Sequence, residues 1–223
     1  MDIKSANTEN QWEYENFFHW TSSQNRMGKI LAHYELYKKI VNLPGDIVEL
    51  GVFKMNSLIR WATFRNLIES EYSRNIYGFD MFGSFPVPME SSQNDKDFIS
   101  IHNKLPDRFT LQEAKKVIEY KNFRNVELIE GDIFDTLKNF INLKVGNLRI
   151  SLLHLDLDLD SPTAFALEIL WEYIVSGGII VIDDYASVGS ASDAIDKFIM
   201  DKNLKGALKK GLYLSNPSYI IKP

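Results

Sequence analysis

Acidic residues follow five short apolar runs of this chain, and their type and spacing could hold a metal ion beside a small molecule. In chain order, the residues at the run ends are Glu49 with Gly51, Asp80, Gly131 with Asp132, Asp156, and Asp183 with Asp184. The C-terminal ends of strands in an open parallel sheet border its ligand crevice, so we expect these acids to share one rim. Two unit charges about 4 Å apart repel by roughly 4 kcal/mol at an effective dielectric constant near 20. Such acids must protonate, separate or bind a cation, and a cation is the simplest answer.

The LDLD and IDDY motifs make the strongest case for a metal. Asp156 and Asp158 would point to the same side if strand geometry continued, because side chains alternate with a period of two. Asp183 and Asp184 follow the next apolar run. One such aspartate more often caps a helix or binds a loop, but the combination reverses those odds. Two or three carboxylates with water and substrate oxygens suit Mg²⁺, or Mn²⁺ in its place. His154, inside the fourth run, is predicted to be a core histidine rather than a ligand.

The first run predicts a nucleoside site rather than a dinucleotide site. Residues 51–57 (GVFKMNS) lack the second and third glycines of the G-x-G-x-x-G pattern that binds a pyrophosphate. Gly51 still lets a ligand approach the backbone closely, and Asn56 or Ser57 can cap the following helix. Asp80, at the end of the second run, is placed to accept hydrogen bonds from ribose hydroxyls.

A mainly parallel sheet would position these residues. Five apolar runs are predicted as strands, at 46–51, 75–80, 125–129, 149–155 and 178–182. Four segments are predicted as helices, at 57–69, 111–121, 163–173 and 191–200. Strands that are apolar throughout are buried on both faces, which is typical of a parallel sheet covered by helices. The predicted fold class is α/β.

Three further segments carry structural predictions. Residues 12–41 are rich in aromatic residues, and their apolar positions recur near a helical period, which predicts two helices broken near residues 22–25. This pair should cover a core edge or a subunit interface. The alternative is that it forms a wall of the pocket for the small molecule on which the site acts. Residues 82–107 are too long for a routine connection and are predicted to form a lid. Residues 212–221 offer two short strands that would add an antiparallel edge.

Composition restricts the class of protein. The 223 residues, 45% of them hydrophobic, predict one domain over 1–223, with 1–44 as an N-terminal helical extension. The net charge of −5 argues against a nucleic-acid partner and favours a small molecule. The absence of cysteine excludes disulfides, thiolate metal sites and cysteine nucleophiles. Residues 1–10 lack the pattern of a signal peptide, and no apolar run approaches the roughly 20 residues that span a bilayer, so we expect a cytoplasmic protein that does not enter membranes.

Five motifs in a fixed order resemble the macrocin O-methyltransferase (TylF-type) family. They are ELGVF at 49–53, YGFD at 77–80, EGDI at 130–133, LDLD at 155–158 and GGIIVIDDY at 177–185. The RMGK segment at 26–29 and the helix after it also resemble this family. The resemblance spans about residues 20–222, and the order of the motifs is more specific than any one of them.

This resemblance implies a class I methyltransferase fold, which is Rossmann-like. Its mainly parallel seven-stranded sheet has an antiparallel C-terminal strand, with N-terminal helices added. It also implies S-adenosylmethionine as methyl donor, Mg²⁺ as the metal, and a sugar or phenol hydroxyl as acceptor, with a sugar favoured. The residues implied for the donor site are Glu49 and Gly51 at the methionine half, Asp80 at the ribose, Asp132 and Ile133 at the adenine, and Val52, Ser57, Gly131 and Asp156 around them.

The same resemblance implies the catalytic roles. Asp156, Asp183 and Asp184 would hold the metal, and Asp156 and Asp158 would form the catalytic centre. Asp158 is the candidate general base, taking the proton of the acceptor oxygen as that oxygen attacks the methyl group in line. Met55 departs from the family pattern, because relatives commonly have a glycine there.

Other interpretations remain open at this level. Asp156-Leu157-Asp158 also matches the Asp-x-Asp pattern of metal-dependent glycosyltransferases, although that leaves Glu49 and Asp80 unexplained. A non-catalytic subunit with the same fold, or a hydroxylase similar to cephalosporin hydroxylases, would also carry this pattern. The aromatic N-terminal helices suit a homodimer or a higher homo-oligomer.

Overall fold

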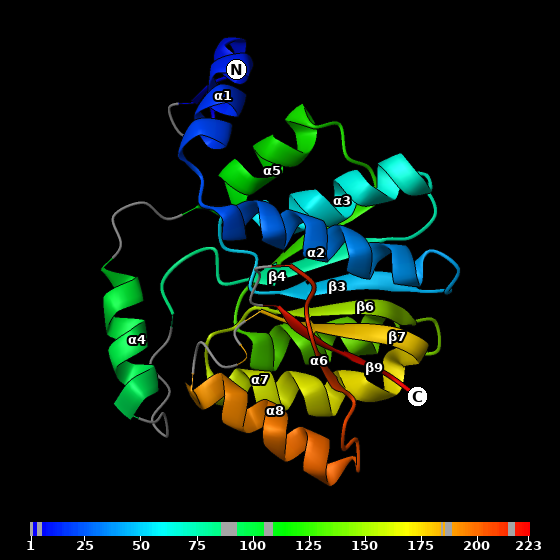
Figure 1. Cartoon of the computed structure of the whole chain (residues 1–223). Coiled ribbons are helices and arrows are strands. Elements are labelled where there is room, and N and C mark those ends of the chain that lie inside the picture. The colour runs from blue at the N-terminus through cyan, green and yellow to red at the C-terminus, as the bar shows by residue number, and fades with distance from the viewer. Residues whose placement is uncertain are drawn as a thin grey trace.

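A seven-stranded sheet with helices on both faces forms the centre of the protein (Figure 1). The computed structural model describes residues 2–3, 6–85, 93–104, 109–183, 185, 189–213 and 217–223. The strand order is β5-β4-β3-β6-β7-β9-β8. These strands are β3 (Asp46–Leu50), β4 (Ile76–Asp80), β5 (Val126–Glu130), β6 (Ile150–Leu155), β7 (Ile174–Ile182), β8 (Leu208–Lys210) and β9 (Ser218–Ile221).

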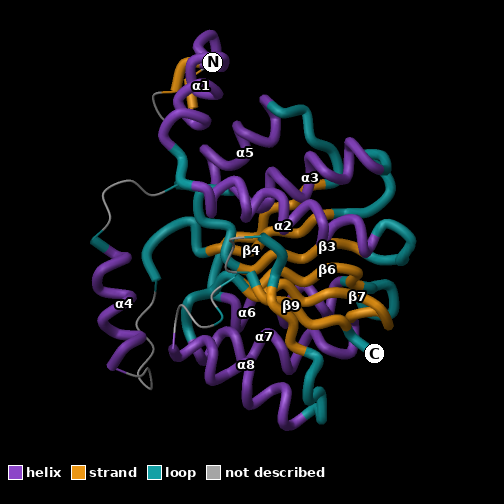
Figure 2. The backbone as a smooth tube through the Cα atoms, viewed as in Figure 1, coloured by secondary structure: helices purple, strands orange, loops and turns teal. Residues whose placement is uncertain are grey.

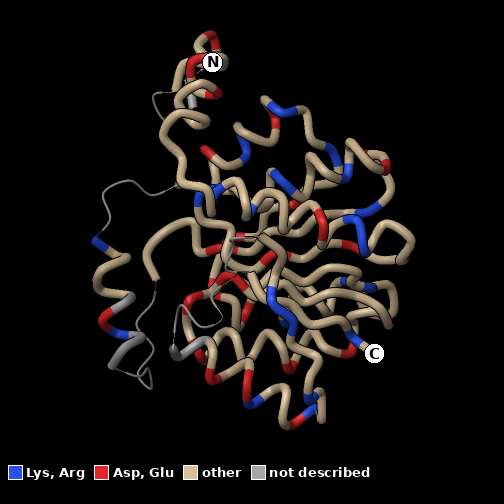
Figure 3. The backbone as a smooth tube through the Cα atoms, in the orientation of Figure 1, with Lys and Arg blue, Asp and Glu red and all other residues tan. Residues whose placement is uncertain are grey.

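The pairing confirms the predicted mainly parallel sheet. Strands β5, β4, β3, β6 and β7 are paired in parallel, while β9 is antiparallel to both β7 and β8. All five predicted central strands are present. The C-terminal ends of β3, β4, β5 and β6 therefore lie along one edge, and Figure 3 shows acidic positions gathered around that edge on the side of α4.

Alternating side chains of the central strands build a core on each face of the sheet. Val48 and Leu50 of β3 pack into the apolar cluster on one face, while Ile47 packs into the cluster on the other. Every residue of β6 is buried. Burial on both faces explains why these strands appear in the sequence as continuous apolar runs.

Helices cover both faces of the sheet. Figure 1 shows α2, α3 and α5 on one face and α6, α7 and α8 on the other. Their bounds, with those of the remaining elements, are β1 (Asp2–Ile3), β2 (Ala6–Asn7), η1 (Thr8–Asn10), α1 (Gln11–Thr21), α2 (Gln24–Ile40), α3 (Asn56–Ile68), α4 (Gln93–Asn103), α5 (Leu111–Tyr120), α6 (Ile133–Leu143), α7 (Asp160–Leu170), η2 (Trp171–Tyr173) and α8 (Gly189–Asp201). Figure 2 shows the short β1–β2 hairpin beside α1. No helix among the described residues has both the length and the apolar character needed to cross a membrane.

The two predicted N-terminal helices are confirmed, and four features differ from the sequence prediction. The lid segment contains a helix, α4, where only a long loop was expected. Helix α6 was missed, because Asp132 was assigned to a ligand although it caps this helix. Strand β7 begins at Ile174, ahead of a register shift that lets the strand bend. The first of the two predicted tail strands is not formed at residues 212–213, residues 214–216 lie outside the described residues, and β8 lies earlier, at Leu208–Lys210.

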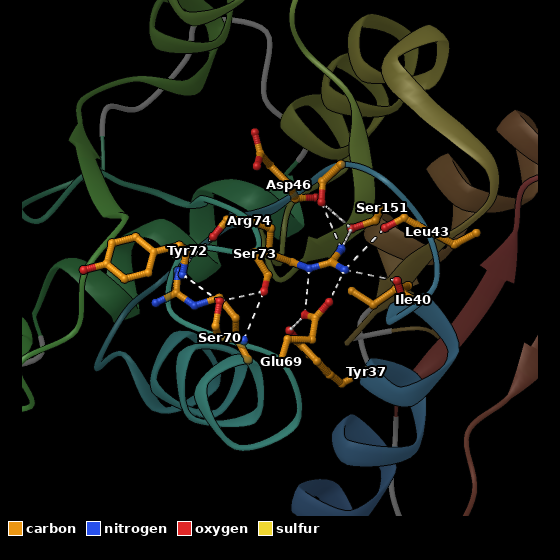
Figure 4. A network of polar contacts seen from close by, with 12 residues as sticks. Tyr37, Ile40, Leu43, Asp46, Glu69, Ser70, Tyr72, Ser73, Arg74 and Ser151 are labelled. Carbon is orange, nitrogen blue, oxygen red and sulfur yellow. Dashed lines mark hydrogen bonds and ion pairs between the residues drawn. The ribbon is translucent and has the colours of Figure 1, made fainter.

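Arg74 joins several elements at the opposite edge of the sheet from the acids (Figure 4). Its buried guanidinium donates to both carboxylate oxygens of Glu69, at 2.6 and 2.9 Å, and to Ser151 Oγ at 2.6 Å. It also donates to the carbonyl oxygens of Ile40, Leu43 and Gly45. The end of α2, the turn before β3, the end of α3 and the start of β6 are thereby held together.

Replacing Arg74 with lysine is expected to lower the free energy of unfolding by about 2–4 kcal/mol. The ammonium group keeps the charge but lacks the planar fork, so several buried acceptors lose their donor. Urea denaturation would measure the loss. The matched control is Arg124→Lys, whose side chain is 59% exposed and lies 3.6 Å from Glu71. A change in both variants of no more than about 0.5 kcal/mol, the usual size at the surface, would contradict this role of Arg74.

Candidate active site

A cavity of about 280 Å³ lies at the C-terminal ends of β3, β4, β5 and β6. It brings together seven of the predicted site residues, which are Gly51, Asp80, Gly131, Asp132, Ile133, Asp156 and Asp158. In the sequence these residues lie between positions 51 and 158. The fold therefore brings the predicted strand-end residues together around one pocket.

Gly51 is required by the close approach of two strand ends. Its φ is 89°, and a Cβ atom there would lie 1.8 Å from the carbonyl oxygen of Asp156. The backbone N–H of Asp156 donates to the carbonyl oxygen of Leu50 at 2.9 Å, which fixes this contact. A side chain at position 51 would push β3 and β6 apart, whatever ligand the cavity takes.

The carboxylate of Asp80 holds two loops of the cavity wall. Its Oδ2 accepts hydrogen bonds from the backbone N–H groups of Val52 (2.9 Å) and Phe53 (2.7 Å), and its Oδ1 accepts one from Phe82 N–H (2.8 Å). Phe53 and Phe82 have φ values of 45° and 46°, in the left-handed region that non-glycine residues rarely adopt. These hydrogen bonds offset that conformational cost. Oδ1, which accepts only one of these hydrogen bonds, has further acceptor capacity toward a ligand hydroxyl.

Asp132 and its neighbours form the next part of the wall. The Oδ1 atom of Asp132 accepts a hydrogen bond from Phe134 N–H at 2.9 Å and so caps α6. Gly131 has a φ of 131°, which allows the chain to turn from β5 into the helix. Ile133 is the first residue of α6 and lines the cavity.

Sequence analysis missed the aromatic part of the cavity. Phe53, Phe82 and Phe134 line it, and each lies two residues after a predicted strand-end residue, so this spacing was the available signal. His102 of α4 also lines it, with its ring edge-on to Phe53 and Phe85 at centroid distances of 5.5 and 5.2 Å. Aromatic walls of this kind suit a flat ring such as a nucleobase.

The predicted lid contributes directly to this cavity. Phe85 and His102 both lie within 82–107. The backbone of Phe85 is held by the side-chain amide of Asn103 through two hydrogen bonds, of 2.9 and 3.0 Å. Residues 86–92 and 105–107 of this segment lie outside the described residues. The described part of the lid is therefore a wall of the cavity.

Three predicted donor-site residues, Glu49, Val52 and Ser57, stand behind the cavity wall. Glu49 is fully buried and accepts a hydrogen bond from Ser57 Oγ at 2.8 Å. Val52 packs in an apolar cluster. The expectation that Asn56 or Ser57 caps α3 is wrong, because Met55 occupies the cap position and makes no side-chain cap bond. Ser57 is turned to Glu49 instead, so contact of these residues with a donor remains a prediction.

Behind the cavity, His154 lies between two buried carboxylates. Its Nδ1 is 3.4 Å from Glu49 Oε2, and its Nε2 is 3.7 Å from Asp183 Oδ1. These distances exceed those of normal hydrogen bonds, so the attraction is mainly electrostatic. Burial alone would lower the pKa of His154, but the carboxylates of Asp183 and Glu49 outweigh it and raise this pKa to about 10. His154 is thus the predicted core histidine, and the two carboxylates favour its charged form.

Asp183 also forms an ion pair with a lysine of the second N-terminal helix. Lys29 Nζ, on α2, lies 2.5 Å from Asp183 Oδ2. Burial would raise the pKa of Asp183, but His154 and Lys29 hold it far below its usual range. Asp156 differs, because burial and then the repulsion by Asp183 raise its pKa to about 7. Asp184, the third predicted metal ligand, lies outside the described residues.

His33 of α2 is a further residue that sequence analysis missed. It is fully buried, it stacks on Trp61 at a centroid distance of 4.5 Å, and neither ring nitrogen has a hydrogen-bond partner among the described residues. Burial, and next the charge of His154, lower its pKa well below the usual value, so the ring is neutral. His33, His154 and Asp183 each offer one potential ligand atom within 4.8 Å of the others. No local pattern could reveal this grouping, because the three residues come from different elements.

Replacing Met55 with glycine, the residue that the family resemblance implies at this position, is expected to lower the free energy of unfolding by about 1–3 kcal/mol. Met55 has a φ of 66°, and glycine would recover roughly 1–2 kcal/mol of that cost. Its side chain is only 1% exposed, however, and truncating a buried methionine costs about 2–5 kcal/mol. Urea denaturation would measure the balance. Asn203→Gly is the control, since Asn203 has a φ of 53° but an exposed side chain. A Met55→Gly protein as stable as wild type would contradict this account.

Known proteins that resemble this chain include O-methyltransferases. The family model of macrocin O-methyltransferase (TylF) matches residues 19–211. The demethyldecarbamoylnovobiocin O-methyltransferase of Streptomyces niveus is 25% identical over 166 residues, which are 70% of this chain and 59% of that protein. A tetracenomycin-C 4'-O-methyltransferase of Streptomyces olivaceus, whose name specifies an 8-demethyl-8-(2,3-dimethoxy-alpha-L-rhamnosyl) compound, is 29% identical over 161 residues, 70% of this chain and 58% of that protein. The chain thus spans less than two thirds of these relatives.

A solved structure supports the fold. The crystal structure of CalS11, a calicheamicin methyltransferase, superposes with a TM-score of 0.73 at 23% identity, covering 97% of this chain and 87% of that one. The match over residues 19–211 includes all the predicted site residues. The chain belongs to the macrocin O-methyltransferase (TylF) family.

Proposed function

We propose that this protein transfers a methyl group from S-adenosylmethionine to a hydroxyl oxygen of a sugar-bearing small molecule. The observation that carries the proposal is the convergence of Gly51, Asp80, Asp132, Asp156 and Asp158 on one cavity. A nucleoside with a short charged tail fits the arrangement, because the carboxylate of Asp80 can take hydroxyls and the phenylalanine walls can take a base. Family membership and the rhamnosyl compound named for the Streptomyces olivaceus relative support an O-methylation of this kind.

The residues present fit a Mg²⁺ ion. Asp156 and Asp183 supply carboxylate oxygens, the ligand type that Mg²⁺ prefers, and we keep Asp184 as the third proposed ligand. Burial and the repulsion by Asp183 raise the pKa of Asp156 to about 7. A bound divalent cation would offset this repulsion and stabilise the charged carboxylates. Mn²⁺ is the alternative ion. Bound there, the metal would make the acceptor hydroxyl more acidic and fix its oxygen.

The protein's own residues would perform the remaining tasks. Asp158, at the cavity surface, would accept the acceptor's proton as the oxygen attacks the methyl carbon and the bond from that carbon to sulfur breaks. The phenylalanines and His102 would keep water from the reacting atoms. Asp80, held by three backbone N–H groups, would orient the ribose, so that positioning supplies much of the rate.

The proposal is tested by a methyl-transfer assay with radiolabelled S-adenosylmethionine and a panel of glycosides, phenols and free sugars. We expect transfer to a sugar-bearing acceptor, and a fall of at least about tenfold after chelation that Mg²⁺ restores. Transfer that is indifferent to chelation would refute the metal role. Absence of transfer to the whole panel, together with absence of donor binding, would refute the function.

We also propose that α1 mediates a homodimer. No residue of α1 is buried, and Trp12 and Trp20 are 68% and 70% exposed. Exposed aromatic groups on one helix are typical of a protein interface. Light scattering should give twice the chain mass for wild type and the chain mass for a Trp12→Ser/Trp20→Ser double variant. A monomeric wild type at micromolar concentration would contradict this assembly.

A further inference from the structure

A second cavity, of about 410 Å³, adjoins the start of α3 and is basic. It is lined by the guanidinium-bearing residues Arg26 and Arg60, by hydroxyl residues of the α1–α2 junction such as Ser22, and by Asn56. The connection between β3 and α3 borders both cavities, with Phe53 on the first and Asn56 on the second. The basic cavity is therefore a neighbour of the proposed donor site.

Arg60 lines this cavity and is half-buried. Its side chain makes no hydrogen bond or close ion pair with any residue in the described part of the chain. Burial and then the nearby charge of Arg26 lower the pKa of Arg60. An arginine that is partly desolvated and beside a second positive charge costs free energy unless an anion offsets it.

The carboxylates near Arg60 are already paired with other cations. Asp183 and Glu49 are the acidic residues that act on Arg60 electrostatically. Asp183 already has Lys29 at 2.5 Å and His154 at 3.7 Å, while Glu49 has His154 at 3.4 Å. The positive charges of Arg26 and Arg60 are thus not needed to neutralise these carboxylates. They lie at one cavity of a chain whose net charge is −5.

We propose that the basic cavity binds a phosphate or diphosphate group of the methyl acceptor, so that the acceptor is a phosphorylated or nucleotide-linked sugar. This inference rests on the proposed function, since it assigns the acceptor class of that same site. Two guanidinium groups bind phosphate oxygens bidentately, and hydroxyl groups such as that of Ser22 add donors. The first backbone N–H groups of α3, which begins at Asn56, lie at the same cavity and favour an anion.

The location suits an acceptor that reaches the reacting atoms. Arg60 interacts electrostatically with Asp183, and Asp183 interacts with Asp156 of the donor cavity. A sugar anchored by its phosphate near Arg60 would extend past Asp183 toward Asp156 and Asp158. The acidic centre would then lie between the phosphate anchor and the methyl donor.

Binding is tested first, with inorganic pyrophosphate as the probe and calorimetry as the readout. We expect Arg60→Gln and Arg26→Gln each to weaken pyrophosphate binding at least about tenfold and the double variant to abolish it. Arg124→Gln, an exposed control, should bind as wild type does. Affinity for S-adenosylhomocysteine should be unchanged in all four variants, because neither Arg26 nor Arg60 lines the donor cavity.

Steady-state kinetics then distinguishes a phosphate from a carboxylate as the group that the basic cavity binds. Arg60→Gln should raise KM at least about tenfold for a hexose 1-phosphate or a nucleoside-diphosphate sugar, with kcat within about threefold. The KM for a neutral glycoside should stay the same. If a uronic acid is affected but phosphorylated sugars are not, the cavity takes a carboxylate and the phosphate proposal is overturned.

A measurement on wild type covers the case in which the arginine variants do not fold. Phenylglyoxal modification, mapped by mass spectrometry, should be slowed by pyrophosphate at Arg26 and Arg60 but not at Arg124. Equal rates with and without pyrophosphate would overturn the inference. Failure of S-adenosylhomocysteine to bind would instead count against the proposed function, and the two failures are therefore distinguishable.

Discussion

Replacing Asp158 with asparagine is expected to lower kcat by about 10²- to 10⁴-fold, the usual loss when a general base is removed. Asp158 lines the donor cavity two residues after Asp156, where its carboxylate can meet the acceptor's proton. Its φ is 58°, and asparagine adopts this left-handed region as readily as aspartate does. Asparagine therefore suits the backbone at this position while it removes the proton acceptor.

Two measurements distinguish this role from a structural one. Steady-state kinetics should show the fall in kcat, while calorimetry with S-adenosylhomocysteine should give a Kd within about threefold of wild type. Asp160→Asn is the matched control, because Asp160 begins α7 and does not line the cavity. An Asp158→Asn enzyme with at least a third of the wild-type kcat would exclude Asp158 as the general base.

Replacing Asp183 with asparagine is expected to lower the free energy of unfolding by about 3–5 kcal/mol. The carboxylate of Asp183 is buried between Lys29 at 2.5 Å and His154 at 3.7 Å. An amide of the same size leaves Lys29 without its counter-charge and leaves His154 with Glu49 alone, in a largely buried region. The same change should also remove stimulation of turnover by Mg²⁺, because one proposed metal ligand is lost.

A double-mutant cycle isolates this interaction. Lys29→Met combined with Asp183→Asn should cost less than the sum of the two single changes, because each single change leaves a charge unpaired. Asp201→Asn, an exposed acid at the end of α8, is the control and should change stability by no more than about 0.5 kcal/mol. Additive losses from Lys29 and Asp183 would show that the pair does not interact as the structure indicates.

The sheet and the donor cavity could be predicted from the sequence because both depend on local patterns. Buried parallel strands appear as apolar runs, and the residue after each run must lie at the C-terminal edge of the sheet. This logic placed Gly51, Asp80, Asp132 and Asp156 around one cavity, as the structure confirms. Gly51 also carries a second requirement, contact with the backbone of Asp156, that a sequence alone does not reveal.

The buried charge network could not be predicted, because it depends on packing between distant segments. Lys29 and Asp183 are 154 positions apart, and they meet only because α2 covers the sheet face next to β7. His33 likewise reaches His154 from α2. The strand-end pattern treated Glu49 as a cavity residue, but in a central strand that is buried on both faces its side chain points into the core toward His154.

Calorimetric titration with S-adenosylhomocysteine, the product of methyl donation, tests the central claim most directly. The account predicts micromolar binding to wild type, and no detectable binding of NAD, since the turn after β3 lacks the glycines of a dinucleotide site. Folded protein that gives no heat with S-adenosylhomocysteine, with Mg²⁺ or after chelation, would contradict the assignment of the donor cavity and with it the proposed methyl transfer.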